Sequence, residues 1–133
     1  MRTRLNLLHR TIGIITVVIF VGTGALMRFH YSRIYESNYL VRMMFRSIHI
    51  YILLAGLLNI AIGIYMVVSS ETRKRNAQLF GSVCLLIAPA VLIGAFFYEP
   101  ALASLERHVT QAGIILLLVG TLSHLAASRA RAA

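Results

Sequence analysis

Four long stretches of the chain carry no charged residue, and they constrain the fold more than any other feature. They cover Thr11–Met27, Ser47–Ser70, Asn76–Tyr98 and Val109–Ser128. Each is close to the roughly 20 apolar residues that a helix needs to cross the hydrocarbon core of a bilayer. With their flanks they predict transmembrane helices over about 9–29, 46–70, 76–98 and 108–128. We therefore expect residues 1–133 to form one all-α integral membrane domain.

The composition agrees with a membrane protein and excludes a nucleic-acid-binding one. The chain is 59% hydrophobic and only 13% charged, whereas about 25% is typical of soluble domains. Its net charge of +9 comes from basic residues that lie between or outside the apolar stretches. Such residues face lipid headgroups and do not form one basic surface, so we expect anionic phospholipids as partners and no nucleic acid.

The distribution of Lys and Arg predicts the orientation of the helices. Eight of the thirteen basic residues flank one side of the predicted bundle and five flank the other. The more basic side faces the cytoplasm in most membrane proteins. Since short connections favour antiparallel neighbours, we expect an up-down-up-down four-helix bundle with both termini cytoplasmic. We place it in a bacterial inner membrane.

The first span has a second interpretation, as a signal peptide. Basic residues precede an apolar stretch, and Thr23 with Ala25 would form a small-residue cleavage site. Because this stretch is longer than a typical signal core and three further spans follow, we expect the first helix to be retained.

Prolines and acidic residues mark the third span. Pro89 predicts a kink inside it, with the freed carbonyl satisfied by a neighbouring helix. Glu99-Pro100 predicts its end, because a residue before proline avoids helical geometry. The chain has no Asp, and all four Glu are predicted outside the spans. A carboxylate-bridged metal pair inside the membrane therefore has no support.

The second span carries an unusual stripe of residues. At about 100° per residue, one helix face collects two guanidinium groups, an imidazole and two glycines, namely Arg42, Arg46, His49, Gly56 and Gly63. Small residues allow helices to pack closely, and arginines near a helix end can extend to the headgroups. Packing alone could explain the stripe, but ionisable side chains in spans also suggest a functional site.

The five histidines fall near the two membrane surfaces. In the predicted topology, His30, His49 and His108 share the outer side, whereas His9 and His124 share the cytoplasmic side. A b-type haem needs two imidazole ligands from facing helices, close apolar walls and cations for its propionates.

These requirements select candidate ligands. We predict His49 as one haem ligand, with His30 or His108 opposite it as the other metal ligand, and Arg42 and Arg46 as propionate partners. His9 with His124 is the second choice of ligand pair.

In outline, four spans with histidines near both surfaces resemble the four-helix membrane cytochromes b. The resemblance concerns architecture and histidine placement, and it implies haem b as cofactor and transmembrane electron transfer as function. Two-haem members often carry two histidines on one helix at a fixed spacing of several turns. That spacing is absent here, so one haem is expected rather than two.

Other functions remain open. A cofactor-free accessory or scaffold subunit of a larger membrane complex, or a homo-oligomer, needs only the packing faces. Thioether and imidazole groups near the outer surface would suit copper, and they are Met27, His30, Met43, Met44 and His49. A small transporter component would use a polar path along Thr16, Thr23 and Asn59. In each case we expect a carrier or subunit rather than a stand-alone catalyst.

Overall fold

The described chain folds into four long helices. The computed structural model describes the backbone of residues 2–33 and 38–129 and the side chains of residues 4–33 and 38–128. The helices are α1 (Arg2–Phe29), α3 (Tyr39–Tyr65), α4 (Thr72–Leu102) and α5 (His108–Arg129). Each is long and apolar enough to cross a membrane, which confirms the all-α prediction with four candidate spans.

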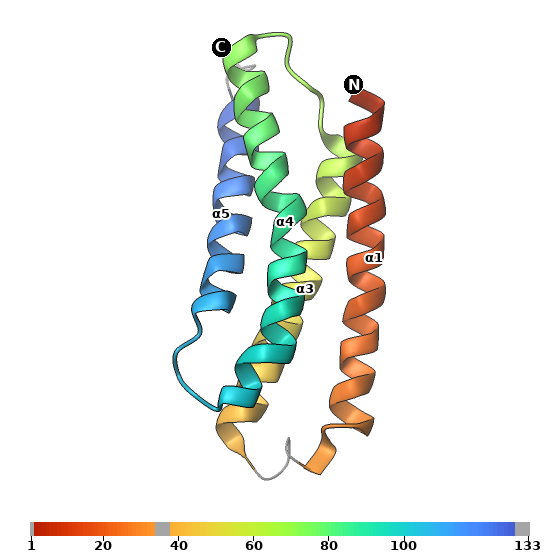
Figure 1. The fold of residues 1–133 in the computed structure, drawn as a ribbon. Helices are drawn as coiled ribbons and strands as arrows, with labels where there is room; N and C mark the ends of the chain where they lie inside the picture. Colours follow the sequence, from red (N-terminus) through yellow and green to blue (C-terminus); the bar gives the residue numbers. More distant parts are fainter. Residues whose placement is uncertain (1, 34–37, 130–133) are drawn as a thin grey trace.

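The four helices form two hairpins that pack through their inner members (Figure 1). Helix α1 lies along α3, α5 lies along α4, and α3 packs on α4. Both chain termini lie at one end of the bundle, together with the connection between α3 and α4 (Figure 1). We name this the terminal end. At the opposite end, α1 leads into α3 and α4 leads into α5.

Glycines let the two helices of each hairpin approach closely. A Cβ atom on Gly13 would lie 2.8 Å from the carbonyl oxygen of Gly56, and one on Gly63 would lie 2.8 Å from that of Asn6. In the second hairpin, a Cβ on Gly81 would lie 2.8 Å from the carbonyl oxygen of Gly120. The helix face predicted to carry Gly56 and Gly63 is therefore covered by α1.

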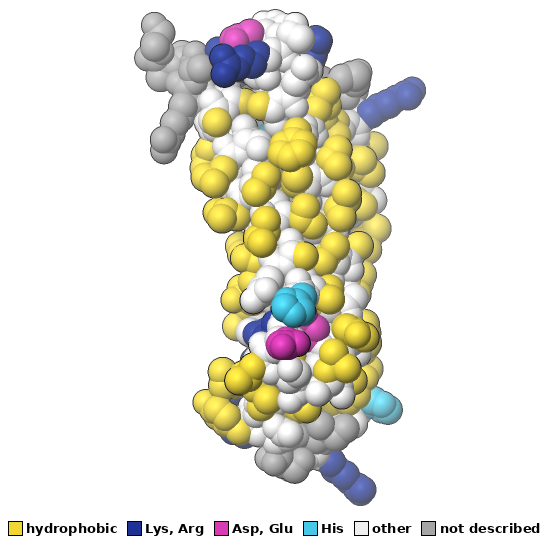
Figure 2. Space-filling view, turned by 60° about the vertical axis from the view of Figure 1, so that its left-hand side comes forward, with side chains coloured by type: hydrophobic (Ala, Val, Ile, Leu, Met, Phe, Trp, Pro, Cys, Tyr) yellow, Lys and Arg dark blue, Asp and Glu magenta, His cyan; other side chains and the backbone are white. Residues whose placement is uncertain are grey.

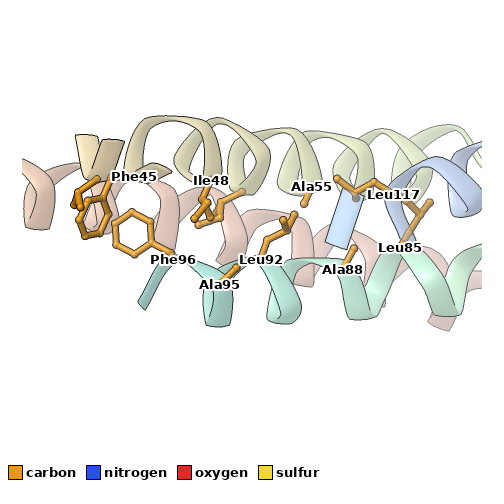
Figure 3. Packing of buried hydrophobic residues seen from close by; sticks show 11 residues of the cluster. Phe45, Ile48, Ala55, Leu85, Ala88, Leu92, Ala95, Phe96 and Leu117 are labelled. Atoms are coloured by element: carbon orange, nitrogen blue, oxygen red, sulfur yellow. The ribbon is translucent and has the colours of Figure 1, made fainter. Parts of the chain in front are cut away.

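An apolar cluster joins the two hairpins over most of their length. Side chains of α3, such as Ile48 and Ala55, pack in one cluster with Leu85, Leu92 and Phe96 of α4 (Figure 3). All five are fully buried. On the face that Figure 2 shows, hydrophobic side chains also cover the middle of the bundle, and most charged groups lie nearer its ends. This pattern suits a bundle whose outside faces lipid.

Helix α3 is displaced toward the N-terminus relative to its predicted span of 46–70. It begins after Asn38, whose side-chain oxygen caps the amide of Val41 at 3.2 Å, and it ends before Met66, which is extended. Arg42 and Arg46 therefore lie within its first two turns. A prediction from charge-free stretches leaves these turns out, because arginines at a helix end extend to the headgroups while their backbone stays helical.

Helix α4 continues through Glu99 and Pro100 to Leu102, four residues beyond the end of the predicted span 76–98. Pro100 sits in the last turn, where its missing N–H removes only one backbone hydrogen bond. Glu99 is 2% exposed, so the prediction that every glutamate lies outside the helical spans is wrong for this residue.

Candidate functional site

A buried polar cluster lies between the two hairpins at the terminal end. Each of the four helices contributes one side chain, and a fifth comes from the residue that follows α3. In chain order they are His9, Asn59, Met66, Ser82 and His124. Each is at most 7% exposed. The second-choice ligand pair from the sequence, His9 and His124, is thus brought together here.

Pro89 explains why an asparagine is buried in this cluster. Proline has no N–H, so it leaves the carbonyl of the residue four positions earlier without its helical partner. That residue is Leu85, and Asn59 Nδ2 donates to its carbonyl oxygen at 2.7 Å. The same amide nitrogen donates to the carbonyl of Ala55 at 2.9 Å. The prediction that a neighbouring helix satisfies the carbonyl freed by Pro89 is confirmed.

These two bonds determine the protonation of the His9 ring. With both amide hydrogens of Asn59 donated to carbonyls, its Oδ1 atom can only accept. His9 Nδ1 lies 2.7 Å from that oxygen, so Nδ1 carries the proton. The Nε2 atom of the neutral ring then holds a lone pair, and it is buried without a hydrogen-bond partner. A histidine oriented through one nitrogen, with the other nitrogen free, is the usual arrangement of a metal ligand.

His124 faces His9 from the other hairpin. Its Nε2 lies 3.1 Å from Ser82 Oγ, which in turn lies 3.9 Å from Met66 Sδ. The His9 and His124 ring centres are 6.3 Å apart, with ring planes at 82°. In their described parts, α1 and α5 have no Cα atoms within 8 Å of each other. The two outer helices therefore meet through this pair of side chains, which we name the imidazole pair.

The start of α1 also caps the end of α3 beside the imidazole pair. Arg10 Nε donates to the carbonyl of Gly63 at 2.9 Å, and Asn6 Nδ2 donates to that of Met66 at 3.0 Å. The last carbonyls of a helix carry partial negative charge, so a guanidinium group is favourable there. These bonds hold α1 and α3 in register next to His9.

At the opposite end, the structure does not assemble the first-choice ligand set. The His49 ring stacks on Phe20 with centres 4.0 Å apart, and its Nδ1 lies 3.0 Å from Thr23 Oγ1. His30 is exposed and contacts Tyr31. His108 is 79% exposed, near Glu106. These contacts place His49, His30 and His108 in three separate surroundings.

The two arginines of the sequence stripe lie outside the core. Arg42 is partly buried, with its guanidinium carbon 5.3 Å from the centre of the Tyr39 ring. Arg46 is exposed. Their neighbour Met44 is buried in the core at 1% exposure, whereas Met43 is 50% exposed. The methionines predicted for a copper site therefore point to different environments.

The buried group at this end is instead Glu99, which sequence reasoning placed outside the membrane. Its Oε1 accepts from the backbone amides of Val109 at 2.8 Å and Thr110 at 3.0 Å, and its Oε2 accepts from the Thr110 hydroxyl. Arg107 Nε lies 3.9 Å from Oε2. A carboxylate from α4 thus caps the N-terminus of α5, where the helix dipole favours negative charge.

The donor groups limit which cofactors the chain can hold. In the described part of the chain, no group of three or more His, Cys, Asp or Glu side chains is close enough to share a metal ion. The imidazole pair supplies two donors. A cavity of about 230 Å³ borders His124 and is lined partly by Met66 and Gln78.

Sequence reasoning missed Ser82, Met66 and the central position of Asn59. A signal for Asn59 was present, since Pro89 requires a donor from another helix and few polar side chains lie in the spans. Ser82 and Met66 gave no comparable signal, because a single serine or methionine is common in apolar helices. Comparison of the chain with known protein families, with curated proteins and with solved structures finds no match.

Proposed function

We propose that this chain is an integral membrane electron carrier that binds one b-type haem through His9 and His124. Both termini then face the cytoplasm, as the positive-inside count predicts, and the protein resides in a bacterial inner membrane. The observation that carries the proposal is the buried, unpartnered Nε2 lone pair of His9, on a ring that Asn59 holds through Nδ1 and whose centre lies 6.3 Å from that of His124.

The donor chemistry fits haem better than a bare metal ion. A structural zinc site uses four protein ligands and a catalytic site three, whereas haem iron needs only axial ligands from the protein. The two imidazoles lie near each other at the junction of the hairpins, with ring centres 6.3 Å apart. A bound haem would supply one-electron transfer.

The residues around the imidazole pair have distinct roles in this proposal. Asn59 keeps the His9 proton on Nδ1 and leaves Nε2 free. Ser82 positions the His124 ring from α4. Arg10, which follows His9 on α1, would supply a guanidinium for a propionate.

The cavity beside His124 is smaller than a haem requires. Pockets for ligands of this size measure about 300–1,000 Å³, and the cavity beside His124 holds about 230 Å³. Haem binding therefore requires the hairpins to part at the terminal end. The contacts of Asn59 with the Leu85 carbonyl and of Ser82 with Met66 join the hairpins there, whereas the apolar cluster holds them along the rest of their length.

The test is a reduced-minus-oxidised visible spectrum of the detergent-purified protein, with iron quantified on the same sample. We expect a Soret and an α-band with about one iron per chain. His9→Ala or His124→Ala should remove the bands, and the matched controls His49→Ala and His108→Ala should retain them. A colourless sample that does not take up added haem would refute the proposal. Loss of colour in His49→Ala alone would move the ligand set to the opposite end.

A cofactor-free accessory or scaffold subunit is the second candidate. The packing at the glycines favours this candidate. The facing helix of the same hairpin fills the space beside Gly13, Gly56 and Gly81, so these residues serve helix packing. Under this function the imidazole pair only joins the two hairpins. His9→Ala would then lower stability without any spectral change, and the protein would co-purify with a larger complex.

A further inference from the structure

The connection between α3 and α4 lies folded along the first turns of α4. It runs from Met66 to Glu71, between the last residue of α3 and the first residue of α4. Gln78 of α4, which is 6% exposed, binds this connection through both polar atoms of its side chain. Its Nε2 donates to the carbonyl of Val67 at 3.0 Å, and its Oε1 accepts from the amide of Ser69 at 2.8 Å. We name these two hydrogen bonds the latch.

The latch shortens the link between the two hairpins. Residues 67–71 separate Met66 from the first residue of α4. Fully extended, these residues would span roughly 17 Å, enough for the end of α3 to move away from α4. With the latch formed, Val67 is bound to Gln78, and the end of α3 is held against α4 through the residue that follows Met66. The latch therefore keeps the inner helices together at the terminal end.

The latch also lies nearer the terminal end than the two polar contacts between the hairpins described above. Ser82 contacts Met66 Sδ about one turn deeper along α4, and Asn59 bonds the Leu85 carbonyl about two turns deeper. In their described parts, the outer helices α1 and α5 have no Cα atoms within 8 Å of each other. Release of the latch therefore frees the ends of the hairpins while the deeper contacts remain.

We propose that the latch controls entry to the space beside the imidazole pair. With the latch formed the terminal end is closed, and with it released the hairpins part there and admit the haem. The latch borders this space, since Val67, Ser69 and Gln78 all line the cavity beside His124. The inference deepens the proposed haem-binding function by naming what regulates its site, and it rests on that function for the identity of the group that enters. The opening itself requires no haem.

The chemistry of the latch suits a contact that opens reversibly. Both partners are backbone groups of a connection at the end of the bundle, where Ser70 and Glu71 are exposed. Water can bond these groups after release, so opening costs the net energy of about two hydrogen bonds. Parting the hairpins along the apolar cluster would instead expose fully buried side chains. Opening is therefore easiest at the terminal end, and loss of the latch should raise the open population about tenfold or more.

The test variant is Gln78→Met, which keeps the length of the side chain and removes both hydrogen bonds. Gln111→Met is the matched control, because Gln111 is exposed on the first turn of α5 at the opposite end. Both variants are made in the full chain and studied without haem and after haem is added.

The distance between the outer helices is measured by double electron–electron resonance on haem-free protein. One pair of spin labels is placed at the terminal end, by Leu7→Cys on α1 and Ala126→Cys on α5. A second pair lies further toward the opposite end, by Val21→Cys and Ile115→Cys. All four positions are exposed. The pairs are made in a Cys84→Ser background, which removes the natural thiol.

In Gln78→Met, the labels at the terminal end should gain a population at longer distance, and the second pair should be unchanged. Uptake of added haem, followed by growth of the Soret band, should be about tenfold faster than in the parent protein. Gln111→Met should change neither measurement.

Equal distances at the terminal end in Gln78→Met and the parent protein would overturn the latch. Equal broadening of both label pairs would also overturn it, because that result indicates a general loss of packing. Longer distances at the terminal end alone, in a protein that takes up no haem, would support the latch and refute the haem. A coloured protein with unchanged distances would do the reverse, so the two failures are distinguishable.

Discussion

The two ends of the bundle carry similar polar residues but use them differently. At the terminal end, His9 and His124 are buried and joined through Asn59 and Ser82 to the helices between them. At the opposite end, the histidines lie on or near the surface, and one carboxylate, Glu99, occupies the interior. The presence of a histidine near a membrane surface therefore does not predict whether it faces the interior.

The difference follows from which helices meet at each end. His9 and His124 lie on faces of the outer helices that turn toward the gap between α3 and α4. His49 faces α1 within its own hairpin, where Phe20 and Thr23 already surround it. A side chain that faces the partner helix of its own hairpin joins a glycine-packed interface with little room for a ligand. The polar cluster at the junction between the hairpins instead takes side chains from all four helices.

The largest expected loss of stability comes from replacing Glu99 at the opposite end. Glu99→Ala leaves the partly buried Arg107 without its counter-ion and the first amides of α5 without a cap, so we expect a loss of about 3–5 kcal/mol of stability. Glu99→Gln keeps one oxygen for the amides and should lose less. The measurement is unfolding by increasing denaturing detergent, followed by circular dichroism. Equal stability of Glu99→Ala and the parent protein would show that this carboxylate does not hold α4 to α5.

At the terminal end, the matching test is Asn59→Ala. It leaves the Leu85 carbonyl and His9 Nδ1 without partners, at a cost of about 2 kcal/mol. Pro89→Ala supplies an N–H that can bond the Leu85 carbonyl within α4. In a Pro89→Ala background, Asn59→Ala should therefore cost about 1 kcal/mol less. Additive effects of the two substitutions in the same unfolding assay would contradict the link between Pro89 and Asn59.

The sequence was sufficient for the helices but not for the site. Four charge-free stretches predicted four helices because bilayer thickness sets their length, and Pro89 predicted a donor from another helix. The helix wheel correctly grouped Gly56 and Gly63 with His49 on one face, but it could not show that this face packs against α1. Glu99 escaped prediction because its partners, Val109 and Thr110, lie across a turn whose path depends on tertiary packing.

The smallest expected loss of stability is that of His49→Phe, which we compare with the same substitution at His9. His49→Phe keeps the stack on Phe20, and Thr23 stays satisfied because its hydroxyl also donates to the Phe20 carbonyl at 2.9 Å. Its cost should be below about 1 kcal/mol, within the range of one interhelical hydrogen bond in a membrane protein. His9→Phe instead removes the only described donor to Asn59 Oδ1, so it should cost about 1–3 kcal/mol. Both variants are compared by detergent-induced unfolding of haem-free protein, so that cofactor loss does not contribute. If His49→Phe costs as much as His9→Phe, then burial between the hairpins is not what distinguishes the two ends, and His49 has a structural role that its contacts with α1 do not explain.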